Sequence, residues 1–297
     1  MRRRFLLIAN PAAGLATSTL LEATCARLRA EGAHAVEVRP PSIEAAREEA
    51  QRASCSGAFD AVVAAGGDGT IRQVAAGLVG TPMPLGIIPA GTANVLAIEI
   101  GLATRPAAIV DALLHGPATR MVCARANGEL FLLMAGAGLD ARVLGLISQR
   151  LKSRLGKAAF AGPIVDALTH PVDRLTVTVD GVKHEASWVI LANAAHYAGN
   201  FVLAPAAAIG APDLQAIIFK GRTRATLMGQ IMSLAIRPLR TRAARDGDVV
   251  ITPCRRAIVT ALNPVPTQLD GDVFGTTPLS VEAATDTLQL ILPARPA

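Results

Sequence analysis

Residues 61–70 read Ala-Val-Val-Ala-Ala-Gly-Gly-Asp-Gly-Thr, and this stretch decides the fold. The apolar run Ala61–Ala65 has the composition of a buried strand, and residues 71–79 have the spacing of a helix. Glycines between a strand and a helix let backbone N–H groups approach an anion, and the helix N-terminus adds positive potential. Gly66–Thr70 therefore predicts a phosphate-binding loop in an α/β domain.

An aspartate lies inside this loop. The Asp68 carboxylate would repel a bare phosphate, so it favours a metal-bound phosphate such as Mg-nucleotide. A glycine-rich turn that binds no ligand is the alternative interpretation of the loop taken alone.

The composition limits the classes of protein to which the chain can belong. Its 297 residues suggest one large or two ordinary domains, and 51% hydrophobic residues can fill a sizeable core. The formal net charge of +6 favours anionic partners, namely a nucleotide, a nucleic acid or an acidic membrane surface. Because only 3% of the residues are aromatic, single-stranded nucleic acid is a poor candidate.

Cysteine and histidine spacing argues against a structural metal or a disulfide framework. The four cysteines include no Cys-x-x-Cys pair, and the five histidines include no His-x-x-x-His pair. Widely spaced single cysteines fit a reducing cytosol. The apolar segment at the N-terminus is too short for a signal peptide, and no apolar run is long enough to span a bilayer.

Strand-like and helix-like segments alternate in the first part of the chain. The expected strands are 5–10, 35–39, 61–65 and 85–88, and the expected helices are 19–30, 43–53, 71–79, 95–100 and 106–114. Thr19, Ser42 and Thr104 are the expected N-caps of three of these helices. The alternation predicts a parallel sheet with helices on both faces.

Three polar loops follow strands of this predicted sheet. They are Asn10–Gly14, Gly66–Thr70 and Pro89–Asn94, all rich in Gly, Asn or Thr. Ligands of open α/β sheets bind outside the carboxyl ends of the strands. We therefore expect the three loops to converge on one binding site.

The pattern changes after Gly116-Pro117, where strand-like runs dominate. These runs are 121–125, 130–135, 175–179, 187–192, 214–219, 249–251 and 257–262, with a turn expected at Asp180-Gly181. The fold class is thus α/β plus β. We expect a Rossmann-like parallel domain over 1–118, with the tail 286–297 as a candidate addition to it, and a mainly antiparallel, sandwich-like domain over 119–285.

Two basic stretches interrupt the second part. Residues 142–157 carry five basic residues and 220–245 carry seven, and neither stretch contains an acid. A helix at an anionic membrane surface and a packed helix with solvated ends both fit the second stretch.

Four motifs occur in one order along the chain. They are Asn10-Pro11-x-x-Gly14, Gly66–Thr70, Pro89-x-Gly91-Thr92-x-Asn94 and Asp270-Gly271-Asp272. In order and spacing they resemble the diacylglycerol kinase catalytic family, the lipid kinases that include bacterial diacylglycerol-kinase-like enzymes, sphingosine kinases and ceramide kinases. Further matches are Gly136-x-Gly138-x-Asp140, Leu155-Gly156-Lys157 and the segment Asn193–Pro205, so the likeness covers nearly the whole chain.

The resemblance implies a two-domain enzyme with its active site in the cleft between the domains. The α/β domain would bind ATP and the β-rich domain would help to hold a lipid. The implied nucleotide contacts are Asn10, Gly14, Gly66, Gly67, Asp68, Gly69, Thr70, Arg72, Gly91, Thr92 and Asn94. Asp68 would hold Mg²⁺. The implied setting is cytoplasmic and peripheral, with a lipid substrate at an anionic surface on the inner face of the membrane and no nucleic acid.

The same resemblance implies a base in the last motif. Phosphoryl transfer needs positioning, charge neutralisation and a group that receives the hydroxyl proton. We favour Asp270 as this base, with Asp272 as the alternative, because family members usually have Asp-Gly-Glu at the motif. A plain hairpin turn is the further interpretation of an Asp-Gly pair.

The chain departs from the family pattern at three places. Val95 stands where many relatives have Asp, and Cys123 where many have an acid. These differences predict fewer acidic groups for metal binding around Asp68. Gly210–Asp213 replaces an Asp-Asp-Gly segment that binds a structural Mg²⁺, so we expect no second metal site there.

An ATP-dependent kinase for a lipid hydroxyl, of the diacylglycerol or of the sphingolipid/ceramide type, is the leading hypothesis. A soluble NAD-kinase-type enzyme explains the glycine loop alone. A nucleotide-gated lipid-binding protein without catalysis is the third hypothesis. The sequence ranks neither the lipid acceptors nor the oligomeric states.

Overall fold

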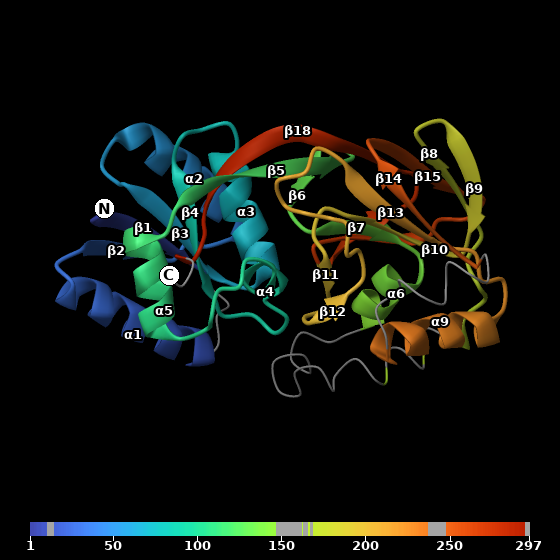
Figure 1. The fold of residues 1–297 in the computed structure, drawn as a ribbon, viewed down its shortest axis with the longest axis horizontal. Coiled ribbons are helices and arrows are strands. Elements are labelled where there is room, and N and C mark those ends of the chain that lie inside the picture. Colours follow the sequence, from blue (N-terminus) through green and yellow to red (C-terminus); the bar gives the residue numbers. More distant parts are fainter. Residues whose placement is uncertain (11–14, 147–161, 163–165, 167–168, 237–247, 295–297) are drawn as a thin grey trace. The chain divides into compact units, whose positions relative to one another are not determined.

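The computed structural model describes residues 1–10, 15–146, 162, 166, 169–236 and 248–294. The chain divides into two compact units, Met1–Val122 with Asp286–Ala297, and Cys123–Thr285. The division falls within strand β5 (Ala118–Ala126) and within strand β18 (Leu279–Ile291) (Figure 1).

A parallel sheet forms the centre of the first unit. Its strands are β1 (Arg4–Ala9), β2 (His34–Val38), β3 (Ala61–Gly66) and β4 (Pro84–Pro89), in the order β2-β1-β3-β4. The C-terminal part of β18 adds a further parallel strand beside β4, with Gln289 opposite Pro84. The helices of the unit are α1 (Leu15–Ala30), α2 (Ile43–Ser56), α3 (Asp68–Leu78), α4 (Val95–Glu99) and α5 (Pro106–His115).

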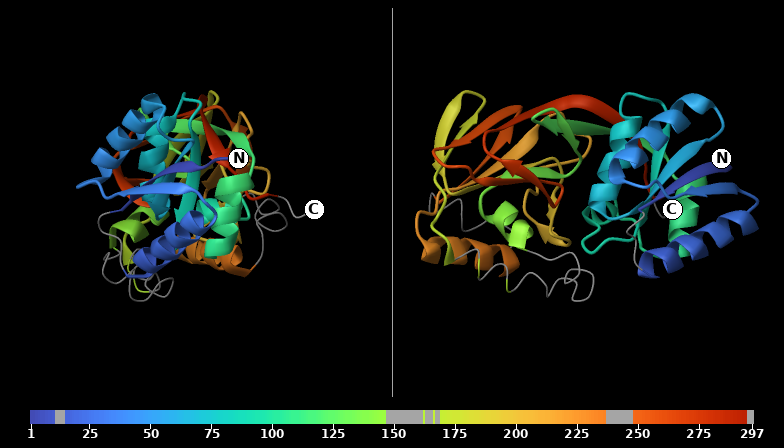
Figure 2. Two further views of the ribbon diagram at one scale, coloured as in Figure 1. Left: turned by 90° about the vertical axis from the view of Figure 1, so that its left-hand side faces the viewer. Right: turned by 180° about the vertical axis from the view of Figure 1, so that it is seen from behind.

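Helices cover both faces of this sheet, as the alternating pattern predicted. Helices α1 and α5 pack together, and so do α2 and α3, on opposite sides of the strands (Figures 1 and 2). The strand order reverses direction between β1 and β3, because β2 lies on one side of β1 whereas β3 and β4 follow on the other. This reversal is the position at which open α/β sheets bind ligands.

Local sequence explains most of these elements. All six residues of β3 are buried, which is typical of a strand covered on both faces. Ser42 caps α2 as predicted, and its hydroxyl accepts the Ala45 N–H at 3.2 Å. The other two cap predictions were wrong: α1 begins at Leu15, so Thr19 lies inside it, and α5 has Arg105 at the N-cap, followed by a proline whose fixed φ suits the first helical position.

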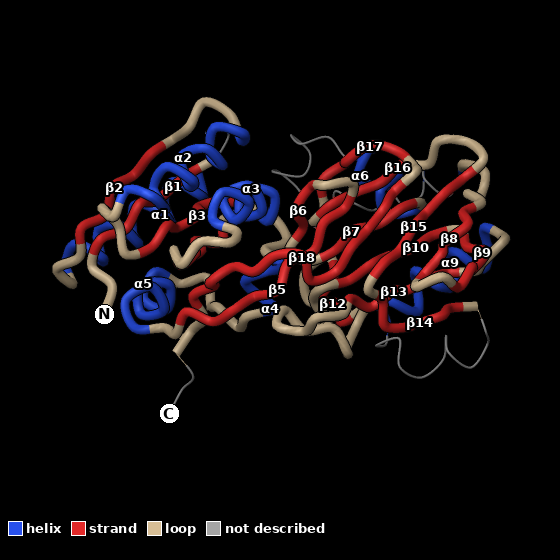
Figure 3. Tube along the Cα trace, turned by 90° about the horizontal axis from the view of Figure 1, so that it is seen from above, coloured by secondary structure: helices blue, strands red, loops and turns tan. Residues whose placement is uncertain are grey.

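Strands, red in Figure 3, make up most of the second unit. They pair mainly antiparallel. Its strands, besides parts of β5 and β18, are β6 (Glu129–Phe131), β7 (Met134–Ala137), β8 (Leu175–Val179), β9 (Val182–Ala186), β10 (Trp188–Ala192), β11 (His196–Tyr197), β12 (Phe201–Val202), β13 (Leu214–Phe219), β14 (Val249–Cys254), β15 (Arg256–Ala261), β16 (Pro266–Leu269) and β17 (Asp272–Thr276). Its described helices are α6 (Leu139–Leu146) and α9 (Arg224–Ile236).

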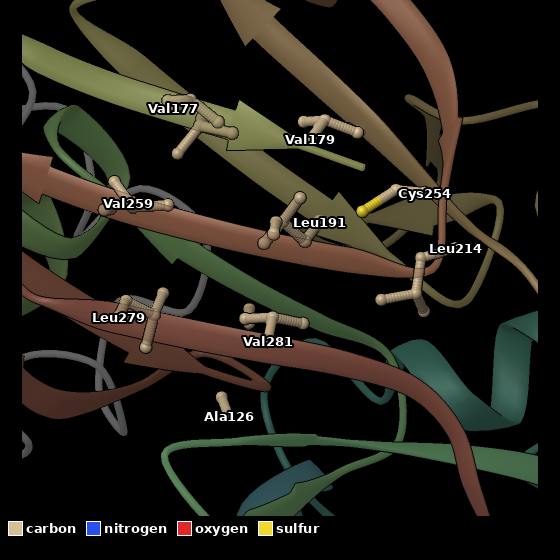
Figure 4. Close-up of a cluster of buried hydrophobic side chains, with 14 of the residues drawn as sticks. Ala126, Val177, Val179, Leu191, Leu214, Cys254, Val259, Leu279 and Val281 are labelled. Carbon is tan, nitrogen blue, oxygen red and sulfur yellow. The ribbon is translucent and has the colours of Figure 1, made fainter. Parts of the chain in front are cut away.

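Two sheets of this unit enclose one core. One sheet has the order β14-β13-β10-β7-β16-β17, and the other contains β18-β15-β8-β9. Val177, Leu191 and Val259, from three different strands, are fully buried in the core between them (Figure 4). The predicted alternation over Leu175–Val179 is confirmed, because its residues are buried at every second position.

The expected strand over 130–135 is two strands. β6 ends at Phe131 and β7 begins at Met134, so Leu132 and Leu133 form a buried connection. A connection of this kind needs partners for its backbone N–H groups, and an aspartate far along the chain provides them. None of the described helices has the length and apolar character needed to span a bilayer.

Candidate active site

Three loops of the first unit lie at the carboxyl ends of adjacent parallel strands. Ala9 of β1 pairs with Ala65 of β3, and Gly66 pairs with Pro89 of β4. The pairing continues into the loops, because the Asn10 N–H donates to the Ala65 carbonyl at 3.1 Å and the Ala90 N–H donates to the Gly66 carbonyl at 2.9 Å. The predicted convergence of these loops is therefore found as far as Asn10. Gly14 lies outside the described residues.

The second and third loops touch through their backbones. A Cβ placed on Gly91 would lie 2.5 Å from the Cα of Gly67, closer than any side chain tolerates. A Cβ on Gly66 would lie 2.7 Å from the Thr70 hydroxyl oxygen. Glycine at position 91 thus permits the close approach of the two loops, and glycine at position 66 leaves room for the Thr70 side chain.

The first loop is joined to this pair by side chains. The Asn10 amide donates to the Thr70 hydroxyl at 3.0 Å, which links the two strands on either side of the sheet reversal. Asn94, with φ +47°, accepts the Gly91 N–H at 2.7 Å and donates to the Gly91 carbonyl at 3.0 Å. Asn10 and Asn94 therefore shape the loops with the same amide groups that were predicted to contact a nucleotide.

Asp68 binds the backbone of the third loop's helix. Its carboxylate accepts the Val95 N–H at 3.0 Å and the Leu96 N–H at 3.1 Å. These are the first N–H groups of α4, whose own N-cap residue provides no side-chain cap. The carboxylate therefore ties the glycine loop to α4.

The metal prediction can be tested against the donor set. No cluster of three or more His, Cys, Asp or Glu side chains occurs in the described part of the chain. A dedicated metal cage therefore does not fit these residues. A single carboxylate beside a phosphate loop does fit Mg²⁺ that is bound chiefly through phosphate oxygens.

The remaining predicted nucleotide residues lie in or next to these loops. Arg72 is on α3 and is 9% exposed, and Thr92 is half-buried in the third loop. Val95 and Cys123, the departures from the family pattern, are both buried apolar positions. Asp213 forms an exposed ion pair with Arg255 at 2.7 Å.

The Asp270-Gly271 pair forms the hairpin turn between β16 and β17. Both residues have positive φ, +50° and +86°, as a two-residue type I′ turn requires. Asp270 is buried, and its carboxylate accepts three backbone N–H groups at 2.8–3.0 Å, from Leu132, Leu133 and Met134. It therefore holds the connection between β6 and β7.

Asp272 occupies a different environment. It is the first residue of β17, pairs with Leu269 across the hairpin and is half-buried. The two acids of the predicted catalytic turn thus differ in position, one within the turn and buried, the other at the start of β17 and half-buried.

Two buried polar side chains, Gln268 and Asp140, form a hydrogen-bonded network with the backbone of this turn. Gln268 accepts the Gly271 N–H at 2.9 Å through Oε1 and donates through Nε2 to Asp140 at 3.1 Å. Asp140 also accepts the Ala141 N–H at 2.8 Å. Burial raises the pKa of Asp140 to about 6, and the hydrogen bonds only partly offset this effect.

Sequence reasoning did not include this network among the site residues. Asp140 was visible only as part of the Gly136-x-Gly138-x-Asp140 motif, and nothing in the sequence marked Gln268. Asn193, from the last quoted motif, donates to the Leu132 carbonyl at 2.8 Å and is buried. It supports the same connection that Asp270 binds.

The predicted basic stretches are described only in part. Of the first, residues 147–157 lie outside the described residues, and of the second, 237–245 do. In the described part, Arg224 at the start of α9 donates to the Thr169 carbonyl at 2.6 Å.

Two family models match consecutive parts of the chain. The diacylglycerol kinase catalytic domain matches residues 4–126, and the YegS C-terminal NAD kinase beta sandwich-like domain matches residues 134–292. Together they cover both units.

Individual proteins agree with these matches. A diacylglycerol kinase of Bacillus subtilis is 27% identical over 252 residues, covering 82% of this chain and 80% of the relative. An uncharacterized protein of Synechocystis is 31% identical over 238 residues, and the match spans 78% of this chain but only 54% of that protein.

Solved structures share the fold. A diacylglycerol kinase from Bacillus anthracis has a TM-score of 0.72 at 20% identity, covering 98% of this chain and 97% of that one. Yeast NADH kinase, complexed with NADH, has a TM-score of 0.50 at 12% identity, covering 99% and 84%. At these identities the likeness concerns the fold alone.

Proposed function

Since the chain belongs to the diacylglycerol kinase family of lipid kinases, we propose that it transfers the γ-phosphate of ATP to a hydroxyl group of a membrane lipid. The acceptor is a lipid alcohol of the diacylglycerol or of the sphingolipid/ceramide type. The observation that carries the proposal is the packing of Asn10 and of two loops, Gly66–Thr70 and Pro89–Asn94, at the reversal point of the parallel sheet, with Gly67 and Gly91 in close backbone contact.

The nucleotide half of the proposed reaction belongs to the first unit. Helix α3 begins at Asp68, inside the Gly66–Thr70 segment and directly after its two glycines Gly66 and Gly67, so its N-terminal N–H groups and dipole favour a phosphate there. Asp68 would hold Mg²⁺ beside the phosphates, while its hydrogen bonds to Val95 and Leu96 keep α4 in place. When bound, the ion supplies charge neutralisation to the phosphates.

The second unit would supply the base, and its geometry favours Asp272 over Asp270. Three buried N–H groups occupy the Asp270 oxygens, so a movement of this carboxylate toward a substrate would leave those donors unpaired. The other acid of the motif, the half-buried Asp272 at the start of β17, is therefore the one that we assign to receive the proton of the lipid hydroxyl. This assignment reverses the preference that the sequence alone suggested.

A peripheral position at an anionic membrane surface completes the proposal. A membrane lipid has to be reached at the bilayer surface, and the net charge of +6 attracts anionic head groups. The test is binding to vesicles with and without anionic phospholipid, where the proposal expects binding only to the anionic vesicles.

The function is tested by supplying the purified chain with Mg²⁺, γ-labelled ATP and a panel of acceptors in detergent micelles. The panel contains diacylglycerol, monoacylglycerol, sphingosine and ceramide, and NAD⁺ is supplied separately without lipid. The proposal expects label in at least one lipid and none in NAD⁺. Label in NAD⁺ alone would establish the nucleotide kinase instead, and ATP binding without transfer would establish a non-catalytic lipid-binding protein.

A further inference from the structure

A continuous series of hydrogen bonds connects the start of α6 to the turn that carries the two acids. Asp140 accepts from the Gln268 amide at 3.1 Å, and Gln268 accepts from Gly271 at 2.9 Å. Gly271 is the residue between Asp270 and Asp272. The series therefore ends on the backbone that orients the proposed base.

The groups at the two ends of the series determine which atoms of Gln268 donate and which accept. The Gly271 N–H can only donate, and an ionised Asp140 can only accept, whereas a glutamine amide offers one acceptor and one donor group. Only one orientation of Gln268 satisfies both neighbours. The carboxylate thus determines which end of the amide faces the turn.

The surroundings leave the network little freedom. Gln268 is 1% exposed and Asp140 is 5% exposed. Gln268 lies opposite Gly136 in the pairing of β16 with β7, and a Cβ on Gly136 would come within 2.6 Å of the Asp140 carboxylate. The absence of a side chain at this position makes room for the carboxyl group beside the glutamine.

The burial of this carboxylate is unfavourable, as its raised pKa indicates. A buried carboxyl group that weakens the fold at neutral pH needs another reason to be present. The amide that donates to it at 3.1 Å belongs to the same glutamine that binds the turn.

We propose that Asp140, acting through Gln268, is a positioning residue that holds the Asp270-Gly271-Asp272 turn in the geometry required for phosphoryl transfer. This inference rests on the proposed function, in which Asp272 receives the proton of the acceptor hydroxyl. A small displacement of a base from its productive position costs about 10²-fold in rate, so a buried support for this turn has a direct catalytic consequence.

The test exchanges the carboxylate and the amide between positions 140 and 268. In Asp140→Asn, one amide oxygen remains for two donors, the Ala141 N–H and the Gln268 amide, so one of them faces the new NH₂ group. In Gln268→Glu, two carboxylates face each other. In the double variant, the amide introduced at position 140 donates to the carboxylate introduced at position 268, and that carboxylate again accepts the Gly271 N–H.

We expect each single variant to lower kcat for lipid phosphorylation about 10–100-fold with little change in the KM for ATP, and the double variant to recover to within about threefold of the original enzyme. Thr267→Val is the matched control, because the Thr267 hydroxyl is buried on the same strand and finds no hydrogen-bond partner among the described residues. It should leave kcat unchanged.

A second measurement does not depend on activity. Hydrogen exchange of the Gly271 amide, followed by NMR on protein labelled with ¹⁵N-glycine, should be slow in the original chain and in the double variant and faster in both single variants. This pattern without any lipid phosphorylation would retain the support of the turn and reject the proposed function. Lipid phosphorylation at unchanged kcat in both single variants, or a double variant no better than the single ones, would overturn the positioning role.

Discussion

Two Asp-Gly turns of the second unit have the same backbone and different surroundings. Asp180-Gly181 joins β8 to β9 with φ values of +47° and +88°, and Asp270-Gly271 joins β16 to β17 with +50° and +86°. In both turns the aspartate accepts backbone N–H groups of another segment. Asp180 binds those of Arg255 and Arg256 at 2.8–3.3 Å, as Asp270 binds the connection before β7.

The turns differ at the neighbouring positions. The residue after the glycine is Val182 in one turn, where it is 59% exposed, and Asp272 in the other. The residue two places before the aspartate is Thr178 in one and the buried Gln268 in the other. In both turns, therefore, the aspartate at the first turn position has a structural role, because it binds the backbone of another segment. What sets the second turn apart is the additional acid and the network behind it.

The largest expected difference between the two turns concerns the buried aspartate. Asn tolerates positive φ, so Asp270→Asn keeps the turn but sets an amide against backbone donors that the carboxylate accepted. We expect this variant to lose about 2–4 kcal/mol in the free energy of unfolding, measured by urea denaturation. Asp180→Asn, at an exposed turn, should lose less than about 1 kcal/mol. Equal losses in the two variants would contradict a special structural role for the buried aspartate.

The next largest effect is a pH dependence of the free energy of unfolding. It comes from Asp140, which lies in the network beside the Asp270-Gly271 turn and has no counterpart among the described residues at the Asp180-Gly181 turn. The folded pKa of Asp140, about 6, is raised above the ordinary value of 3.8. Its contribution to stability is therefore fully present below pH 3.8 and is lost as the pH rises to about 6 and beyond. The pKa of the nearby Tyr197 phenol is raised by burial and by the Asp140 charge, well above this range.

Unfolding free energies of the original chain and of Asp140→Asn, measured from pH 4 to pH 7, test this sign. The original chain should lose up to about 3 kcal/mol relative to the variant over that range. A difference that stays constant with pH would show that Asp140 does not titrate in the folded chain at these values.

The smallest effect should be the same in both turns. Gly181 and Gly271 have nearly equal positive φ, and a Cβ at either would meet no described atom within 4 Å. Alanine at each position should therefore cost about 1 kcal/mol in stability through backbone strain alone. Thermal unfolding of the two variants checks this, and a much larger loss for Gly271→Ala would mean that the second turn is constrained by more than its backbone.

The first unit was the more predictable one from sequence. Its loops follow adjacent parallel strands, so their convergence follows from alternation and the rule for sheet edges. The role of Asp68 in capping α4 was not predictable, because it depends on a contact with the backbone of Val95 and Leu96 that no periodicity reveals.

The second unit was less predictable, because its site depends on contacts between residues that are far apart in the sequence. Antiparallel pairing places Gln268 opposite Gly136 and next to Asp140, although the two hydrogen-bonded side chains are 128 positions apart. Turn chemistry predicted the Asp180-Gly181 hairpin correctly. It could not distinguish the two acids of the other turn, because their difference lies in which backbone donors each carboxylate meets.

In the proposed mechanism, Asp272 receives the proton of a lipid hydroxyl, while Asp270 binds the connection between β6 and β7. The most direct test is the rate of γ-phosphate transfer from saturating ATP to the lipid alcohol in Asp272→Asn, with Val182→Asn as the control at the equivalent position of the other turn. The expected result is a loss of about 10²–10⁴-fold in Asp272→Asn, in a variant that still unfolds cooperatively, and no loss in the control. Transfer by Asp272→Asn within about threefold of the original rate would contradict it.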